Sequence, residues 1–413
     1  MLPRRLKSGI FILEGLNAFA TVEFFFYFYF FMQTRHGYGN RANLTLAALN
    51  GAVCVVSAWG GGQFGQRFGY FTALKLGWGV MFVAMLAGLC LDSAGGHIAV
   101  MACAAAGMCF TWPTLEALTS EGETRAGLQH MLGVYNVVWA AVGAVANFVG
   151  GAMLTQLGPK SLFFGPAAIH ATQLGLTFWL ARQARQRPAQ QLPAPPQQPV
   201  SPPAAWQESS GTSTLPPVAP GMARKFLRMA WLANPFAYIA INTLVALMPG
   251  LTVRLGLSTM LAGFFGSAWC FSRCGAFLTL WLWPGWHYRF RWLLLAYLAL
   301  VASFAAMLTV RSLPVVVLAQ LVFGGAVGLT YYSSLFYSMD VGETKGEHGG
   351  FHEAAIALGN CTGPAVGAAS LYLLPQHANT GAVAVSALLA LGLAGLLGIW
   401  RRHTGGGTGG VAA

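Results

Sequence analysis

Charged residues are scarce in this sequence. Asp, Glu, Lys and Arg together make up 8% of its 413 residues, whereas an ordinary soluble domain contains about 25%. Hydrophobic residues make up 56%, which is more apolar surface than a water-soluble chain of this length could bury. The composition therefore excludes a soluble enzyme and indicates a protein embedded in the lipid bilayer. Its net charge of +12 comes from basic residues that flank apolar segments, so we expect no nucleic-acid partner.

Signatures of cofactor and metal chemistry are also missing. The seven cysteines lie within or at the edges of apolar stretches, with no C-x-x-C pair and no Cys/His cluster. They are expected to be buried thiols, neither a disulfide framework nor a metal site. The sequence has no Walker A lysine motif, dinucleotide-binding glycine fingerprint, G-x-S-x-G elbow or H-E-x-x-H motif. We expect no cofactor, no metal and no ATP-driven transport by this chain alone.

Long apolar runs are what the sequence does contain. A spanning helix needs about 20 mostly apolar residues, because backbone polar groups cannot stay unpaired in hydrocarbon. Twelve segments meet this requirement, which predicts an all-α polytopic membrane protein. The predicted limits are residues 9–32, 44–66, 72–92, 97–119, 132–155, 161–182, 228–250, 257–283, 291–310, 313–336, 350–374 and 380–400.

The placement of basic residues predicts the orientation in the membrane. Cytoplasmic loops carry an excess of Lys and Arg. Of the 23 basic residues, 17 fall on the side of the N-terminus, five fall on the opposite side, and Arg273 falls inside the eighth segment. We therefore expect both termini in the cytoplasm and a multi-pass protein of the plasma (inner) membrane.

A proline-rich stretch divides the segments six and six. Residues 184–222 hold ten of the 20 prolines, a composition typical of an extended linker without a core of its own. It predicts an N-terminal six-helix bundle over residues 1–183 and a C-terminal one over 223–402. The Gly-rich tail, residues 403–413, is expected to be disordered.

Short repeats relate the two halves. Gly122-Glu123-Thr124-Arg125 precedes the fifth segment, and Gly342-Glu343-Thr344-Lys345 precedes the eleventh, which is the fifth of its half. Ser57-Ala58-Trp59 and Ser267-Ala268-Trp269 both lie in the second segment of their half. Two halves related by duplication are the simplest interpretation, and such repeats place a transport site near the middle of the bilayer.

The segment count, central linker and half repeat together resemble the major facilitator superfamily. The most specific local match is the stretch GQFGQRFG from Gly62 to Gly69, which is similar to the family's loop motif G-x-x-x-D-R-x-G. Gln66 stands where the family has Asp, which removes the carboxylate of the family's gating ion pair. The resemblance implies two six-helix bundles with a cytoplasmic gate at this loop. The gate residues that it implies are Gly62, Gln66, Arg67 and Gly69.

Two charges fall deep inside predicted segments. A charge at the middle of the bilayer costs about 2.5–3.5 kcal/mol and needs a partner, a cavity or a function. Glu23, with Tyr27 on the same helical face, could carry a coupling proton; a permanent ion pair or a neutral acid bonded to another helix is the alternative. Arg273 stays charged at any relevant pH, so it must meet a carboxylate, such as Glu23 or Glu353, or an anionic substrate.

Polar residues of the eleventh segment are further candidates. Glu353 lies near the cytoplasmic edge, where a gate or interface role is expected. Asn360 lies on the same face one heptad deeper and could bind substrate or join helices. His348 and His352 have the i, i+4 spacing of a helical zinc site, but the two glycines between them argue against a rigid helix, so no metal site is predicted.

One face of the tenth segment is rich in hydroxyl groups. Hydroxyl groups that face lipid would have no hydrogen-bond partner there, although tyrosine is also common in the interfacial belts of membrane proteins. The resemblance implies that segments one, four, seven and ten line a central cavity, which would suit a neutral or weakly charged amphipathic solute. The residues predicted to face that cavity are Thr330, Tyr331, Ser334 and Tyr337 of the tenth segment with Tyr238 and Asn242 of the seventh.

These features predict a secondary active transporter that moves a small solute by alternating access. Its expected partners are a small-molecule solute, the lipid bilayer and, if transport is coupled, protons; we expect a monomer. One alternative is a lipid-modifying membrane enzyme, for which His348, His352 and Glu353 are the available catalytic groups. A transporter fold retained as a non-transporting sensor is the other, with mild support from the degenerate gate loop.

Overall fold

The computed structural model describes residues 4–120, 125–185, 218–341, 345–377 and 379–402, and within these residues helix is the predominant structure, with no strand. The helices are α1 (Arg4–His36), α2 (Asn40–Phe68), α3 (Tyr70–Cys90), α4 (Ala94–Ser120), α5 (Arg125–Gln156), α6 (Ser161–Arg185), α7 (Pro220–Arg254), α8 (Thr259–Gly266), α9 (Ala268–Leu282), α10 (Phe290–Thr309), α11 (Leu313–Val341), α12 (Lys345–Leu373) and α13 (Thr380–Arg402), with a short 3-10 helix at Pro284–Trp286. The expectation of an all-helical fold is confirmed.

Every predicted apolar segment coincides with helix, and no predicted limit runs more than two residues past a helix end. Within the described residues, nine helices are long and apolar enough to cross a membrane: α1 to α5, α7, α10, α11 and α13. Helix α6 does not meet this standard and carries the buried polar residues His170 and Gln173. Helices α8 and α9 are too short to meet it, with 8 and 15 residues.

The eighth predicted segment is broken in two. Ser267 separates α8 from α9, and its hydroxyl donates a hydrogen bond to the Phe264 carbonyl oxygen at 2.9 Å. Ser258 caps α8 by accepting a hydrogen bond from the Leu261 amide at 3.3 Å, a common way of satisfying a free amide at a helix start. The break lets α8 and α9 follow the surface of α5 separately, because both contact it.

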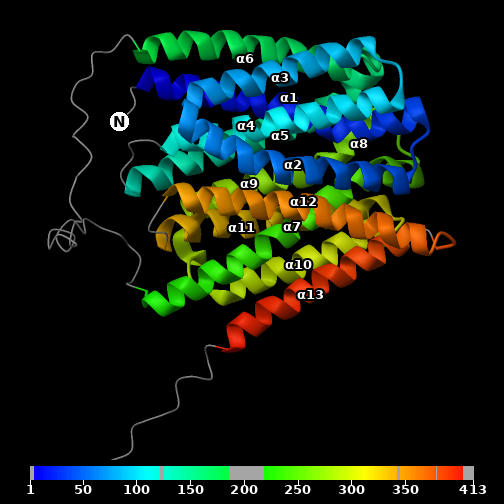
Figure 1. The fold of residues 1–413 in the computed structure, drawn as a ribbon. Helices are drawn as coiled ribbons and strands as arrows, with labels where there is room; N and C mark the ends of the chain where they lie inside the picture. Colours follow the sequence, from blue (N-terminus) through cyan, green and yellow to red (C-terminus); the bar gives the residue numbers. More distant parts are fainter. Residues whose placement is uncertain (1–3, 121–124, 186–217, 342–344, 378, 403–413) are drawn as a thin grey trace, which may run out of the picture.

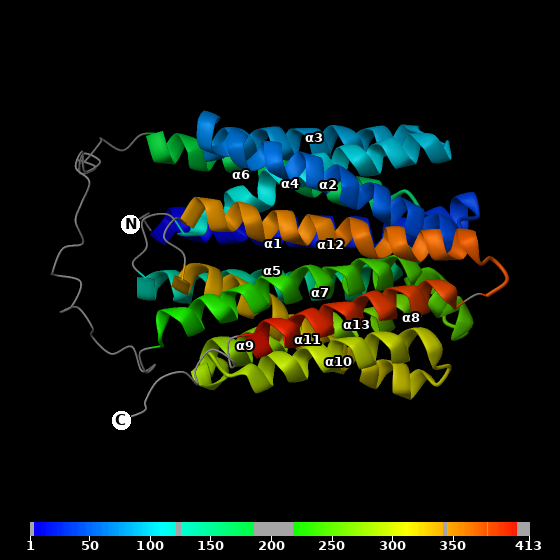
Figure 2. The same ribbon diagram turned by 60° about the horizontal axis from the view of Figure 1, so that its bottom comes forward.

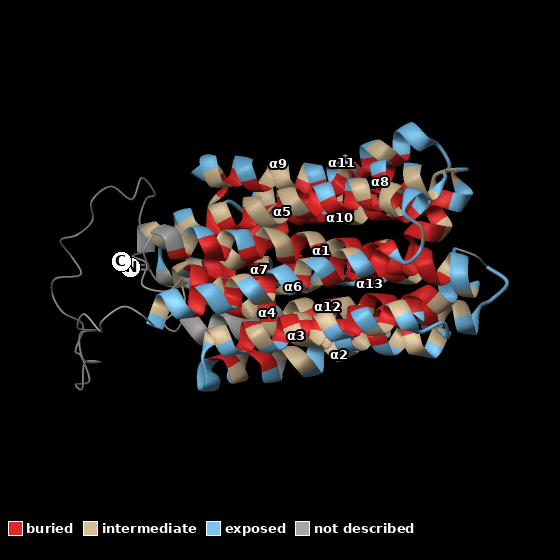
Figure 3. Ribbon diagram, turned by 90° about the horizontal axis from the view of Figure 1, so that it is seen from above, coloured by how far each residue is buried: buried red, intermediate tan, exposed pale blue. Residues whose placement is uncertain are grey.

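The helices run roughly parallel to one another in a single bundle (Figures 1 and 2). Helices α1 and α7 begin, and α6 and α13 end, at the same end of the bundle (Figure 1). We call this the linker end and the other the far end. In Figure 1, α7 and α13 slant toward the helices of the first half as they approach the far end. Exposed positions gather at the two ends and also recur along the outer faces of the helices (Figure 3).

The two halves meet along two seams. Helix α12 lies along α2 (Figure 2), and α5 packs against both α8 and α9. Glycines permit these contacts: a Cβ atom on Gly51 would overlap the backbone of Cys361, and one on Gly263 would lie 3.0 Å from the Phe148 carbonyl oxygen. Small residues of this kind let membrane helices approach closely.

The ends of the predicted linker are helical, because α6 continues to Arg185 and α7 starts at Pro220. Residues 186–217 and the predicted disordered tail, 403–413, lie outside the described residues. Of the repeated tetrapeptides, residues 122–124 and 342–344 also lie outside them. Their last residues, Arg125 and Lys345, begin α5 and α12.

Candidate functional site

Arg273 lies at the seam between the two halves. It belongs to α9, its side chain is 6% exposed, and its guanidinium lies over the indole rings of Trp139 at 4.3 Å and Trp269 at 4.8 Å. Trp139 comes from α5, across the seam. Gly328 of α11 lets that helix approach α9 closely beside the arginine, because a Cβ there would lie 2.7 Å from the Ala276 Cβ.

Arg273 has no carboxylate partner among the described residues. The one ion pair found within them, between Arg35 and Asp92 at 3.4 Å, is on the surface. The Arg273 Nε is buried and has no hydrogen-bond partner. The two tryptophan faces offset part of the cost of burying the charge, since a desolvated cation–π contact is worth about 2 kcal/mol.

Aromatic rings from five helices form a connected group around Trp139, one of the two rings that contact this arginine. The Trp139 ring stacks on Phe277 at 5.9 Å and on Tyr331 at 5.7 Å, and Trp112 meets it edge to face at 5.7 Å. The Tyr331 ring lies 6.3 Å from that of Tyr238. We call these residues the Arg273 cluster: Trp112 of α4, Trp139 of α5, Tyr238 of α7, Trp269, Arg273 and Phe277 of α9, and Tyr331 of α11.

Glu23 lies away from this cluster. Its carboxyl group faces α6 of its own half, where a Cβ on Gly165 would lie 3.8 Å from the Glu23 Oε2. The structure does not bring Glu23 to Arg273, so this predicted pairing is not formed. One turn further along α1, the Tyr27 hydroxyl donates a hydrogen bond to the Asn147 carbonyl oxygen of α5 at 2.5 Å.

A second acid on α1, Glu14, lies nearer to the cluster. It is completely buried, and both of its carboxyl oxygens lack hydrogen-bond partners. It lies beside the Tyr135 hydroxyl of α5, which is also buried. Tyr135 is one helical turn before Trp139, so Glu14 borders the Arg273 cluster.

The polar residues predicted on α7 and α12 do meet. The side-chain amide of Asn242 donates a hydrogen bond to the Asn360 Oδ1, which joins α7 to α12 within the second half. This contact matches the helix-joining role weighed for Asn360. The side chains of Glu353, His348 and His352 lie outside the described residues, although the backbone there belongs to α12.

Two hydroxyl groups of the predicted α11 face, those of Thr330 and Tyr337, bond to the protein backbone. Thr330 donates to the Ala326 carbonyl oxygen at 2.9 Å, as threonines in helices often do. The Tyr337 hydroxyl accepts a hydrogen bond from the Tyr288 amide at 3.0 Å, and the Ser334 carbonyl oxygen accepts one from Ser338 at 2.7 Å. Of the four predicted residues, Tyr331 alone joins the Arg273 cluster.

The structure adds to the site several aromatic residues that sequence reasoning did not select: Trp112, Trp139, Trp269 and Phe277. The sequence holds 13 tryptophans and 28 phenylalanines, and an aromatic residue in an apolar segment is usually core or lipid contact. The available signal was weak: Trp269 lies one helical turn before Arg273, on the same face.

Comparisons with known proteins agree with this architecture. The family model described as Major Facilitator Superfamily matches residues 98–368. This match covers about two thirds of the chain, which decides the family. The chain belongs to the major facilitator superfamily. Its relatives in this superfamily are membrane transporters of small solutes. A search of curated proteins found no match.

Solved transporter structures share the whole fold. A variant of the nucleoside transporter NupG has a TM-score of 0.69 at 12% identity, over 96% of this chain and 100% of NupG. The human organic anion transporter MFSD10 has a TM-score of 0.67 at 16% identity, over 96% and 100%. A bacterial homologue of the human lysosomal transporter Spinster, inward-facing and occupied, has a TM-score of 0.66 at 14% identity, over 96% and 96%. Such low identities establish the fold alone.

The stretch that resembles the major facilitator gate motif is helical at the end of α2 from residue 62 to residue 68, and Gly69 alone forms a tight turn into α3. Gly69 has a φ of +91°, which a residue with a Cβ adopts only at a cost, and its amide bonds to the Gly65 carbonyl oxygen at 3.0 Å. Gln66 and Arg67 are exposed. The Arg67 guanidinium lies 5.3 Å from the Phe68 ring. Glycine is therefore required at 69 by the turn itself.

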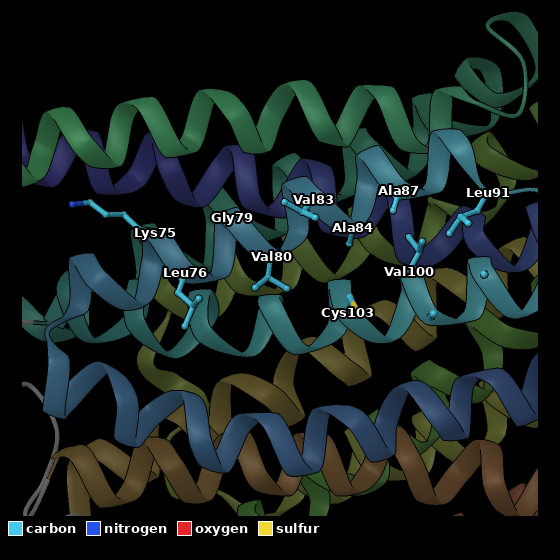
Figure 4. Close-up of a pocket in the computed structure, with 12 residues that line it drawn as sticks. Lys75, Leu76, Gly79, Val80, Val83, Ala84, Ala87, Leu91, Val100 and Cys103 are labelled. Atoms are coloured by element: carbon cyan, nitrogen blue, oxygen red, sulfur yellow. The ribbon is translucent and has the colours of Figure 1, made fainter.

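One other feature of this superfamily member is an outer groove of about 550 Å³ between α3 and α4 (Figure 4). Its lining is apolar except for Lys75 at one edge, where the ammonium lies 4.3 Å from the Phe178 ring. None of the Arg273 cluster lines it. The groove is thus separate from the candidate site.

Proposed function

We propose that the chain is a secondary active transporter in which the two halves rock about the Arg273 cluster and expose it to one side of the membrane at a time. The observation that carries this proposal is the make-up of the cluster: Trp139 belongs to the first half and Arg273 to the second, and the two side chains touch. A rocking motion of the halves would change this contact directly. Sites between repeats are where such transporters bind their solutes.

Contacts at the far end support a closed gate there. The Tyr27 hydroxyl reaches the Asn147 carbonyl across α1 and α5, and the Asn147 amide reaches the Cys270 sulfur across the seam at 3.2 Å. Nearby, the rings of Phe148 and Phe264 lie 4.5 Å apart. In the proposed cycle the two contacts that cross the seam, Asn147 with Cys270 and Phe148 with Phe264, break when the far end opens, while both termini stay on the cytoplasmic side.

Transport itself is tested with purified protein in liposomes. A mixture of labelled small solutes of different charge is offered outside, and the solutes retained inside are measured with and without a pH gradient. We expect at least one solute to enter faster than into protein-free liposomes. A chain that moves no solute in either condition would be a sensor or an enzyme instead.

Coupling to protons is proposed to run through Glu23. This carboxyl group has no cation partner in the described part of the chain, and its Oε2 is buried and unpaired. An isolated buried carboxylate is costly, so Glu23 is proposed to exchange a proton when water reaches it. Tyr27, one turn away, links this position to the far-end contact with α5.

We expect Glu23→Gln to abolish the stimulation of uptake by a pH gradient, because an amide has no proton to release. Exchange of labelled for unlabelled solute at equal pH should continue. Glu14→Gln is the matched control, since it removes another buried carboxyl group from the same helix. The assignment fails if pH-driven uptake is unchanged by the Glu23 substitution or is lost in the control as well.

A further inference from the structure

Arg273 is a permanent cation whose negative partner is missing from the described residues. Two of its chemical features bear on what could replace that partner. The Nε is sealed in the protein without a hydrogen bond. The terminal nitrogens also make no hydrogen bond, and they are not among the fully enclosed atoms. Because Arg273 as a whole is 6% exposed, its charged end keeps a narrow contact with the space outside the protein.

The neighbouring acids do not supply the partner. Glu14 lies beside Tyr135, and Glu116 of α4 interacts with the same tyrosine. Neither forms an ion pair with Arg273. Removing a charge from water costs several kcal/mol, and an unpaired buried arginine is stable only if something else provides compensation. Two indole faces provide part of it, and an anion at its charged end would provide the rest.

We propose that the solute is an organic monoanion whose carboxylate binds Arg273 and whose apolar or aromatic body lies against the rings of the cluster. The assignment rests on the transport function proposed above, because it names what is carried. A planar guanidinium matches a carboxylate through two parallel hydrogen bonds. We assign the solute a single negative charge because no second cation contacts the rings of the cluster within the described residues.

The aromatic residues favour a solute with an apolar part. The rings of Trp139, Tyr331 and Phe277 lie against one another with centroids 5.6–5.9 Å apart. Three rings of the cluster, Trp112, Trp139 and Tyr238, are only partly buried, and a small inorganic anion would make no use of their exposed surface. A carboxylate on an aromatic or alkyl body would use both the cation and the rings, in the manner of binding sites that orient an apolar ligand with a few polar groups.

The test compares carboxylates with their neutral amides, which have nearly the same shape. The full chain is purified, and its thermal unfolding is followed with benzoate or benzamide, hexanoate or hexanamide, and indole-3-acetate or indole-3-acetamide. A ligand that binds only the folded protein raises its unfolding temperature. We expect at least one carboxylate to raise it while the matched amide does not.

Variants assign the effect to Arg273. In Arg273→Gln the carboxylate effect should disappear, with affinity lowered about 10- to 100-fold, the value of one charge-assisted hydrogen bond or more. Arg273→Lys should restore part of it, because the charge remains but the fork is lost. Arg311→Gln removes an exposed arginine and should behave like the native protein.

Two results would overturn the inference: carboxylates that stabilise the native protein no more than their amides, or a carboxylate effect that persists in Arg273→Gln. Should that variant fail to fold, the carboxylate and amide contrast in the native protein and in Arg273→Lys still decides. Uptake in liposomes separates the two proposals. If carboxylates bind the protein but never cross the membrane, only the transport proposal is contradicted. If neutral solutes are taken up and carboxylates have no effect on stability, only the proposed anion site is contradicted.

Discussion

Trp139→Ala is expected to reduce transport by about 100-fold, because the indole at this position links the cation to the rings of both halves. It carries Arg273 on one face and stacks with Phe277 and Tyr331. A desolvated cation–π contact is worth about 2 kcal/mol, and two aromatic pairs add about 0.5 kcal/mol or more each. A loss of about 3 kcal/mol corresponds to roughly 100-fold.

Initial rates of uptake into liposomes measure this effect. Trp139→Phe keeps a ring for stacking but offers a weaker surface to the guanidinium, so its rate should lie between those of the native and alanine proteins. Trp179→Ala is the matched control, since Trp179 is 50% exposed on the outside of α6. A Trp139→Ala protein that transports at the native rate would exclude the cluster as the solute site.

Gly324→Ala is expected to destabilise the protein, whereas Gly325→Ala is expected to leave it unchanged or slightly more stable. A Cβ on Gly324 would overlap the Trp269 carbonyl oxygen, while one on Gly325 would find its nearest atom, the Ser272 Oγ, at 3.9 Å. Overpacking costs about 1–3 kcal/mol. Alanine is favoured over glycine in a helix by up to about 1 kcal/mol, so the two neighbours should change stability in opposite directions.

The unfolding temperatures of the two purified variants measure this difference directly. The pair shares its substitution, its helix and its depth in the bundle, so the comparison isolates the contact between α9 and α11. Since α9 carries both Trp269 and Arg273, Gly324→Ala should also lower the affinity of the cluster for any ligand that binds there. Equal stability of the two variants would mean that α9 and α11 are not packed as described.

Arg273 was accessible to prediction from sequence, because a charge within an apolar segment needs compensation wherever the helices pack. Its partner was not. The candidates Glu23 and Glu353 lie in different helices, and only packing decides which helix faces which. Glu23 turned out to face α6 of its own half, and the guanidinium lies over the two tryptophans instead.

The hydroxyl-rich face of α11 shows again that contacts between side chains could not be predicted from the sequence. Spacing correctly placed Thr330, Ser334 and Tyr337 on one side of a helix, but spacing does not reveal where a hydroxyl bonds. Thr330 bonds to its own helix and Tyr337 to the Tyr288 amide. Such local hydrogen bonds compete with bonds to a ligand, and their geometry depends on side-chain rotation and on neighbouring segments.

The sequence by itself determined the helical class and the approximate ends of the helices, because each apolar run of membrane length must satisfy its own backbone hydrogen bonds. That requirement is local and can be read along the chain. The superfamily was indicated by resemblance, through the segment count, the central linker, the half repeat and the motif at residues 62–69. Only the tertiary structure decided that Trp139 meets Arg273 across the seam and that α8 and α9 separate at Ser267. Contacts between helices depend on shape and on residues far apart in the chain, which no local pattern records.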